Sequence, residues 1–263
     1  MNLRGAPVLV TGASGGIGRA LAVRLGAAGA RLTLFGRGEG ALRAAAEEVV
    51  RAGGESLVVT GDVRRPEDVV RVVREATERF GRLDALVNLA GVAHWRLLEV
   101  TTDDEIQEQI DVNLVGVIRM TRAALPALFA SRGAVVNVSS FAGRVGVPYY
   151  TAYAATRFGV IGLTEALRRE VASRGVRVSL VLPAAVDTPF LEKAGREHAL
   201  GIGPAGILLS PDAVARSIVR ALERHPAEIY LPRTHRIFAI LAVAWPGISD
   251  RILRRLLRYP PAT

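Results

Sequence analysis

Short runs of Val, Leu and Ile alternate with longer stretches of helical pattern along most of the chain. The apolar positions form runs and do not strictly alternate with polar residues, which is typical of strands covered on both faces. We predict strands at Ala6–Val10, Arg31–Phe35, Ser56–Thr60, Ala85–Leu89, Ala134–Ser139, Val176–Leu182 and Glu228–Leu231. We predict helices at Gly16–Ala28, Glu39–Ala52, Pro66–Phe80, Thr102–Ala130, Tyr153–Ser173 and Pro211–Glu223. This succession predicts an α/β fold with a doubly wound parallel sheet flanked by helices.

The succession of strands and helices runs unbroken to Leu182 and then loosens. Residues 183–210 contain several Gly and Pro residues in turn-like contexts, and we interpret this stretch as a substrate flap. Residues 233–263 form a basic tail with helical spacing of apolar residues. No linker, repeat or low-complexity segment divides the chain, so we expect one domain over residues 1–263.

Composition agrees with one well-packed domain and excludes several kinds of site. The 263 residues are 50% hydrophobic and 22% charged, which supports a substantial core and argues against disorder. There is no cysteine, which excludes disulfides, thiol nucleophiles and thiolate metal sites. The four histidines, at positions 94, 198, 225 and 235, show no metal-ligand spacing, so we expect no metal.

The chain leads from Met1 directly into the first strand-like run, so we expect no signal peptide and a cytoplasmic location. Its longest apolar stretch near the end, Ile237–Ile248, is about half as long as a membrane-spanning helix.

The formal net charge is +9, carried by 33 arginines and a single lysine, Lys193. A basic surface can attract nucleic acid, but these arginines are scattered and no compact basic run with interleaved aromatic residues precedes the C-terminus. We therefore expect no nucleic-acid partner.

A glycine-rich turn joins the first predicted strand to the first predicted helix, over Thr11–Gly18. Gly12 can supply an unusual backbone angle, and Gly16 and Gly18 remove side chains where a pyrophosphate or the strand comes close. The helix that follows directs free N–H groups and the positive end of its dipole at an anion. This position at a strand–helix junction favours dinucleotide binding over an ordinary turn.

The motif Thr-Gly-(three residues)-Gly-(one residue)-Gly resembles the short-chain dehydrogenase/reductase family. Further residues match that family and follow in its order, namely Asn88-Leu89-Ala90-Gly91, Asn113, Ser140, Tyr153, Pro183 and Thr188. The resemblance covers the chain from about Val8 to Leu231. The resemblance implies a seven-stranded, single-domain Rossmann fold and hydride transfer between a nicotinamide and an alcohol or carbonyl. It also implies that the partner is a small-molecule substrate.

The resemblance implies four catalytic residues, namely Asn113, Ser140, Tyr153 and Arg157. Ketone reduction needs a proton donor, and tyrosine, with its usual pKa of about 10, works near neutral pH only if a positive charge favours its phenolate. The family supplies that charge with Tyr-(three residues)-Lys, two residues on one helix face. Ser140 matches the substrate-orienting serine, whereas its neighbour Ser139 should point to the other side of the strand. Asn113 matches an asparagine that helps to hold a proton-relay water.

Arg157 departs from the family because it stands where the lysine is expected. Arginine keeps the charge and can reach ribose hydroxyls, but it is longer, planar and unable to give up a proton. Two interpretations stay open. Either an arginine-rich chain has replaced this lysine with activity retained, which we favour, or the protein binds its cofactor with weak or no turnover.

The sequence favours NADP(H) over NAD(H), which stays an alternative. The second predicted strand ends in Phe35-Gly36-Arg37, without the carboxylate that would bind the ribose of NAD, and Arg37 can meet a 2′-phosphate. A second basic residue, frequent in the family's glycine turn, is absent because Gly15 stands there.

The resemblance implies a longer set of cofactor-binding residues, some of which have plain structural alternatives. Asp62 and Val63 match the adenine contact, although Asp62 could also belong to a helix cap. Ala184 replaces the family's glycine after the sixth strand, which permits a backbone shift near the nicotinamide. The full set is Gly12, Ser14, Gly16, Ile17, Gly18, Arg37, Asp62, Val63, Asn88, Ala90, Gly91, Tyr153, Arg157, Pro183, Val186 and Thr188.

A largely apolar substrate pocket is expected near these residues, suited to a moderately hydrophobic ketone or secondary alcohol. Its candidate lining residues could equally be core or oligomer contacts. They are His94, Trp95, Val145, Val147, Tyr149, Phe190 and Leu191.

The C-terminal tail combines the apolar stretch Ile237–Ile248 with a basic amphipathic pattern over Ser249–Tyr259. In the second segment Ile252, Leu253, Leu256 and Leu257 lie opposite Arg251, Arg254, Arg255 and Arg258. Such a helix can lie on an anionic membrane, or it can pack over the substrate cleft or against another subunit, as tails in the family commonly do. We favour packing, and with it a homo-oligomer, a tetramer or a dimer; peripheral membrane contact stays the less favoured alternative.

Overall fold

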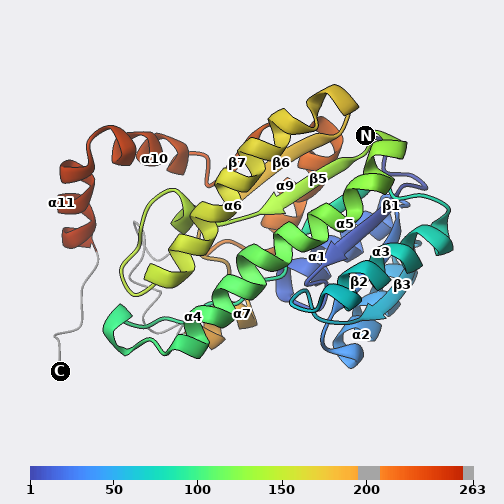
Figure 1. Cartoon of the computed structure of the whole chain (residues 1–263), viewed down its shortest axis with the longest axis horizontal. Helices are drawn as coiled ribbons and strands as arrows, with labels where there is room; N and C mark the ends of the chain where they lie inside the picture. Colours follow the sequence, from blue (N-terminus) through green and yellow to red (C-terminus); the bar gives the residue numbers. More distant parts are fainter. Residues whose placement is uncertain (195–207, 257–263) are drawn as a thin grey trace.

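A single seven-stranded parallel sheet forms the centre of the protein (Figure 1), as seen in a computed structural model that describes residues 1–194 and 208–256. The strand order is β3-β2-β1-β4-β5-β6-β7, and every neighbouring pair is parallel. The strands are β1 (Pro7–Thr11), β2 (Arg31–Gly36), β3 (Glu55–Thr60), β4 (Ala85–Asn88), β5 (Ala134–Val138), β6 (Arg177–Pro183) and β7 (Glu228–Leu231). The predicted doubly wound α/β fold is therefore confirmed.

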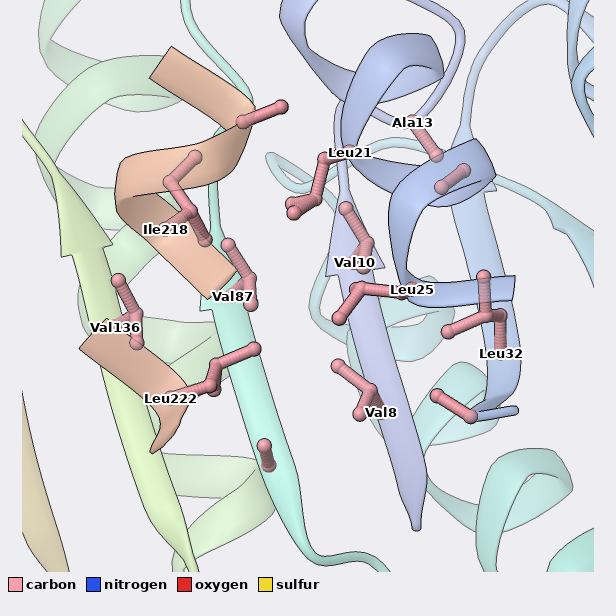
Figure 2. Close-up of a cluster of buried hydrophobic side chains, with 14 of the residues drawn as sticks. Val8, Val10, Ala13, Leu21, Leu25, Leu32, Val87, Val136, Ile218 and Leu222 are labelled. Atoms are coloured by element: carbon pink, nitrogen blue, oxygen red, sulfur yellow. The ribbon is translucent and has the colours of Figure 1, made fainter. Parts of the chain in front are cut away.

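One face of the sheet is covered by α1 (Gly16–Ala27), α2 (Glu39–Arg51) and α9 (Pro211–Arg224). Figure 2 shows how α1 and α9 contact the sheet: Leu21 and Leu25 of α1 and Ile218 and Leu222 of α9 point at side chains of the strands. The continuous apolar runs in the strands are explained by this layer and by a matching one on the opposite face.

The other face is covered by α3 (Pro66–Phe80), α5 (Gly116–Ser131) and α6 (Thr151–Glu170). The bounds of α3 are those predicted, because Pro66 stands at its first turn and Gly81 caps its end with a φ of 77°. Short 3₁₀ turns occupy Leu98–Val100, Phe141–Gly143 and Ala172–Arg174.

The predicted helix over residues 102–130 is interrupted by a wider turn. It consists of α4 (Asp103–Ile110), a π-helical turn (Asp111–Val115) and α5, and Thr102 and Glu105 form a capping box at its start. The combined helix is long and apolar enough to cross a membrane by length and composition. Met120, Ala124 and Leu128, however, are fully buried within the layer that covers the sheet, as in the core helix of a globular domain.

The described part of the expected flap contains more regular structure than its sequence predicted. A short helix, α7 (Pro189–Lys193), follows β6, and Val186 forms an isolated parallel bridge with Leu209. The proline at the first turn of α7 fits a helix start, a signal that the turn-rich composition obscured. Residues 195–207 of the expected flap lie outside the described residues.

Two helices follow β7 and extend beyond the end of the sheet (Figure 1), namely α10 (His235–Ala244) and α11 (Pro246–Leu256). The predicted amphipathic helix over residues 249–259 thus begins earlier, at Pro246, and residues 257–259 lie outside the described part. The apolar stretch over residues 237–248 is divided between the two helices, with Trp245 at their junction.

Candidate active site

The cavity that holds most predicted site residues lies at the carboxyl ends of the strands and has a volume of about 1110 Å³. It opens where the strand order reverses between β1 and β4, which is the position where open α/β sheets bind their ligands. Its lining includes Gly12, Ser14, Gly16, Ile17, Gly18, Arg37, Asp62, Val63, Ala90, Gly91, Ser140, Tyr153, Arg157, Pro183, Val186 and Thr188.

The glycine turn is built so tightly that side chains would not fit. Gly12 has a φ of 69°, and a Cβ there would lie 2.9 Å from the backbone of Ala90. A Cβ at Gly16 would lie 2.7 Å from Cγ2 of Thr188, and one at Gly18 would collide with the carbonyl oxygen of Gly12. The turn therefore leaves bare backbone at the start of α1, which a pyrophosphate can approach.

Thr11 links this turn to the loop after β4. Its Oγ1 accepts hydrogen bonds from the backbone N–H groups of Leu89 (3.0 Å) and Ala90 (3.1 Å). Thr11 was part of the sequence motif but was not predicted to have a role of its own. Its position at the end of β1, opposite the end of β4, was the signal for that role.

Arg37 and Asp62 lie at the end of the cavity formed by the loops after β2 and β3. The Arg37 side chain is mostly exposed, and its Nη1 lies 3.9 Å from Oε1 of Glu108. Asp62 accepts hydrogen bonds from Nε (2.9 Å) and Nη2 (2.7 Å) of Arg64. Burial acts to raise the pKa of Asp62, but the hydrogen bonds from Arg64 and the charges of Arg64 and Arg37 outweigh burial and lower the pKa. This carboxylate is therefore held as an anion.

Ser139 and Ser140 point to opposite sides, as the alternation of a strand predicts. Ser139 donates a hydrogen bond from Oγ to the backbone oxygen of Arg157 (2.9 Å), which ties the end of β5 to α6. Ser140 lines the cavity, and its Oγ accepts a hydrogen bond from the N–H of Ala142 (3.2 Å). The hydroxyl proton of Ser140 is thereby left for a group in the cavity.

Tyr153 and Arg157 lie one turn apart on α6, and both face the cavity. The Cζ atom of Arg157 lies 4.9 Å from the centroid of the Tyr153 ring. Tyr153 also packs against Tyr150, at 5.2 Å between ring centroids, and burial raises the pKa of Tyr150, with a smaller contribution from Tyr153. Tyr150 is thus a neutral aromatic wall beside the candidate proton donor.

Arg157 is a buried cation with few hydrogen bonds. Its Nη2 donates to Oδ1 of Asn113 at 3.4 Å and its Nη1 to the oxygen of Val138 at 3.5 Å, both long, and the buried Nε has no partner among the described residues. No described carboxylate forms an ion pair with it. A buried, under-satisfied guanidinium at a cavity wall fits a ligand with oxygen acceptors.

Asn113 and Asn88 do not line the cavity. Asn113 lies in the π-helical turn, where its Oδ1 accepts from the N–H of Val92 (2.8 Å) and its Nδ2 donates to the oxygen of Val92 (2.9 Å). Asn88 donates from Nδ2 to Thr121 (3.0 Å) and Asn137 (2.9 Å) in the buried layer under α5. The structure thus places Asn113 behind Arg157, as a support, and Asn88 in a structural network.

The substrate side of the cavity differs partly from its predicted lining. His94, Val145, Val147, Phe190 and Leu191 line it as expected. Trp95 and Tyr149 do not; their rings stack on each other at 5.1 Å, and Trp95 meets Tyr150, which takes the lining position. The cavity wall is completed by residues of the C-terminal helices that the sequence prediction missed, namely Thr234, His235, Phe238, Ile252 and Leu253.

Among the residues that the structure describes, no group of three or more His, Asp or Glu side chains could hold a metal ion. That the protein needs no metal stays a prediction.

Comparison with known proteins identifies the family. The family model for short chain dehydrogenases matches residues 6–199. The chain belongs to the short-chain dehydrogenase/reductase family. It is accordingly an NAD(P)-dependent oxidoreductase that acts on carbonyl or CH–OH groups.

Several relatives of this short-chain dehydrogenase/reductase are similar over most of their length. A 3-oxoacyl-[acyl-carrier-protein] reductase of Synechocystis sp. is 35% identical, over 85% of this chain and 91% of the relative. An uncharacterized oxidoreductase of Bacillus subtilis, YxnA, is 32% identical, over 96% of this chain and 72% of the relative.

Many solved structures share the fold, and two of them illustrate the similarity. Levodione reductase has a TM-score of 0.79 at 29% identity and covers 86% of this chain and 95% of its own. The alcohol dehydrogenase from Thermococcus sibiricus, solved with 5-hydroxy-NADP, has a TM-score of 0.75 at 31% identity, with the same coverage.

Proposed function

We propose that this protein is an NADP(H)-dependent reductase of a moderately hydrophobic ketone, or a dehydrogenase of the corresponding secondary alcohol, with Tyr153 as proton donor and acceptor. The observation that carries the proposal is that Ser140, Tyr153 and Arg157 line one cavity, which the glycine turn also lines. These residues supply a carbonyl-orienting hydroxyl, a proton donor and a cation within one apolar site.

The residues present fit a nicotinamide dinucleotide. The glycine turn forms a cradle that Cβ atoms would fill, and the buried Nε of Arg157 has no partner among the described residues, which suits ribose hydroxyls. Gly12, Ser14, Gly16, Ile17 and Gly18 would hold the pyrophosphate, with Asp62 and Val63 at the adenine. Ala90, Gly91, Pro183, Val186 and Thr188 would hold the nicotinamide half. When bound, this cofactor supplies or accepts the hydride.

The chain's own residues handle the oxygen and its proton. Ser140 donates its hydroxyl proton in a hydrogen bond to the substrate carbonyl oxygen, because its Oγ already accepts from Ala142. Tyr153 gives its phenolic proton to the same oxygen as negative charge develops there. The guanidinium of Arg157 stabilises the phenolate that results. Since arginine does not release a proton, the proton returns to Tyr153 through water or a hydroxyl group and not through residue 157.

The preference for NADP(H) rests on Arg37. It follows β2, lines the cavity and has only one long ion pair among the described residues, so its guanidinium can turn to a 2′-phosphate. The relative from Thermococcus sibiricus was solved with an NADP derivative, which supports this preference. NAD(H) stays the alternative.

The proposed substrate class follows from the apolar lining. Val145, Val147, Phe190, Leu191 and Phe238 line the same cavity as Tyr153, and the rings of Phe190 and Tyr153 lie 6.3 Å apart. Relatives named as reductases of 3-oxoacyl-[acyl-carrier-protein] and of levodione are consistent with a carbonyl substrate.

We also propose a homo-oligomer in the cytoplasm. The apolar side chains of Ile118 on α5 and Phe158 on α6 are exposed, and both helices lie on the same side of the sheet, where a second copy could cover them.

NADPH consumption with a panel of ketones, by the natural protein and by Arg157→Lys, tests the proposed activity. We expect turnover by both proteins, with a higher rate for Arg157→Lys because a compact ammonium fits the family's geometry better. Measurable NADPH binding with no turnover by either protein would contradict the proposal and favour a cofactor-binding protein without catalysis. The presence of Arg157 where the family has a lysine is the reason for considering this second function.

A further inference from the structure

The outer face of α10 is apolar and uncovered. Ile237, Ile240 and Leu241 recur at helical spacing on this face and are exposed. Val243 is 74% exposed, and Trp245, at the junction of α10 and α11, is 55% exposed. Exposed apolar side chains gathered this closely mark an interaction surface, whereas single ones are ordinary.

The inner face of the same helix pair belongs to the cavity wall. Ala239 is buried, and Phe238 and Leu253 pack against the body of the protein. Phe238, Ile252 and Leu253 also line the cavity that contains Tyr153. The expectation that the tail packs over the cleft therefore holds for its inner face, but the outer apolar face is not buried within the protomer.

The charge around this surface is strongly positive. Residues 233–263 contain six arginines and a single acidic residue, Asp250. Four arginines here are exposed, namely Arg233 just before α10, Arg236 in its first turn, and Arg251 and Arg255 on α11. A two-fold contact between two copies of this surface would bring these arginines close to one another, which opposes self-association through it.

We propose that the apolar face of α10, with Trp245 and the arginines of α11, docks on an anionic lipid bilayer. Apolar side chains flanked by arginines, with a tryptophan at their edge, are the composition of helices that lie in a membrane interface. Arginines near an anionic leaflet add to the attraction, and the apolar side chains supply the part of the binding that salt does not screen. This proposal takes up the alternative that the sequence analysis favoured less, namely peripheral membrane contact.

Docking in this way would place the cavity next to the lipid, because Ile252 on α11 lines the cavity and is itself exposed. A ketone or alcohol with a long apolar chain could then reach Tyr153 from the bilayer without crossing water. This extension rests on the proposed function, whereas docking itself does not.

Flotation of the full chain with vesicles of phosphatidylcholine, with and without phosphatidylglycerol, tests docking directly. We expect the protein to float with the phosphatidylglycerol vesicles, to bind less to phosphatidylcholine alone, and to be partly released by NaCl. Absence of binding to both kinds of vesicle would overturn the proposal.

The double variant Leu241→Glu/Val243→Glu should lower vesicle partitioning at least about tenfold, because two apolar side chains leave the interface and two negative charges enter it. The matched control is Val50→Glu/Val70→Glu, which changes valines that are 62% and 61% exposed on α2 and α3. The control should bind like the natural protein. Equal losses for both variants would show a general effect of charge and contradict the assignment.

The arginines are tested by Arg251→Glu/Arg255→Glu, which should lower binding to phosphatidylglycerol vesicles about tenfold or more and leave binding to phosphatidylcholine little changed.

Sedimentation velocity of the natural protein and of the variants shows whether a second copy of the chain, and not a bilayer, covers the apolar face of α10. If Leu241→Glu/Val243→Glu dissociates an oligomer and the natural protein does not bind vesicles, the surface is a subunit interface and the proposal fails.

Entry of substrate from the bilayer has a separate readout. Leu241→Glu/Val243→Glu should reduce kcat/KM for a long-chain ketone carried in vesicles and leave it unchanged for a short, water-soluble ketone. Equal kcat/KM values for the vesicle-borne ketone in the natural and variant proteins would contradict entry. No turnover of either ketone would instead count against the proposed function and leave the flotation result standing.

Discussion

The guanidinium carbon of Arg157 lies 4.9 Å from the centre of the Tyr153 ring, one turn back along α6. Arg157 is only 4% exposed, its two hydrogen bonds to described residues are long, and its Nε has no partner in that part of the chain. Packing must therefore hold this cation against the tyrosine. Gly91 is central to that packing, because a Cβ at this position would collide with Nη2 of Arg157.

Gly91→Ala should therefore disturb catalysis without unfolding the protein. The added methyl group must displace the guanidinium of Arg157, and a displacement of about 1 Å in a catalytic constellation can cost on the order of a hundredfold in rate. The expected result is a fall in kcat of this order, measured as NADPH consumption with a ketone that the natural protein reduces.

The matched control is Gly162→Ala on α6, where an added Cβ meets nothing within 4 Å. This change should leave kcat unaltered and raise the free energy of unfolding by up to about 1 kcal/mol, since alanine favours a helix. A Gly91→Ala protein with natural kcat would show that the position of Arg157 does not matter to the reaction.

Arg37→Ala should weaken the binding of NADPH more than that of NADH. The lost contact is a charge-assisted one to the 2′-phosphate, and such hydrogen bonds contribute about 1.5 to 3 kcal/mol, or roughly tenfold to a hundredfold in Kd. Isothermal titration with both cofactors measures the difference. Arg43→Ala, which removes an exposed arginine paired with Glu39 on α2, is the control and should change neither Kd. Equal losses of affinity for NADPH and NADH in Arg37→Ala would show that Arg37 does not bind the 2′-phosphate.

His235, at the start of α10, should make stability depend on pH. Burial lowers its pKa below the usual value, and its ring packs edge-on against Phe141 at 4.5 Å. Since the unfolded chain binds this proton at a higher pH than the folded protein does, stability contributed by neutral His235 is present above about pH 6.5 and is lost as the pH falls through the lowered pKa.

We therefore expect the Tm of the natural protein to fall more steeply than that of His235→Phe between about pH 7 and pH 5. The phenyl ring can keep the contact with Phe141 but cannot be protonated. Parallel curves of Tm against pH for the two proteins would show that His235 is protonated equally in the folded and unfolded states.

The sequence predicted the sheet well because its strands are buried on both faces and its helices have clear ends. The helix over Pro66–Phe80 is an example, since a proline and a glycine mark its two ends. The opposite directions of Ser139 and Ser140 followed from the two-residue period of a strand. The family match also allowed most cavity residues to be predicted by position.

Other features depend on tertiary contacts that no local pattern contains. The π-helical turn at Asn113 has an ordinary helical sequence, and the position of its side chain behind Arg157 depends on the fit between two helices. Asn88 belongs to a cofactor motif, but its amide nitrogen donates its hydrogen bonds to Asn137 and Thr121. The C-terminal helices are apolar on more than one side, so their sequence could not show which side closes the cavity.

In the proposed reaction Tyr153 gives its proton to a carbonyl oxygen beside Arg157, and the variant Tyr153→Phe removes this proton. The measurement is kcat for NADPH-dependent ketone reduction, together with the Kd for NADPH, in the natural and variant proteins. We predict a loss of about a hundredfold or more in kcat with a nearly unchanged Kd, because the variant removes only the proton donor. Unaltered kcat in Tyr153→Phe would show that Tyr153 is not the proton donor.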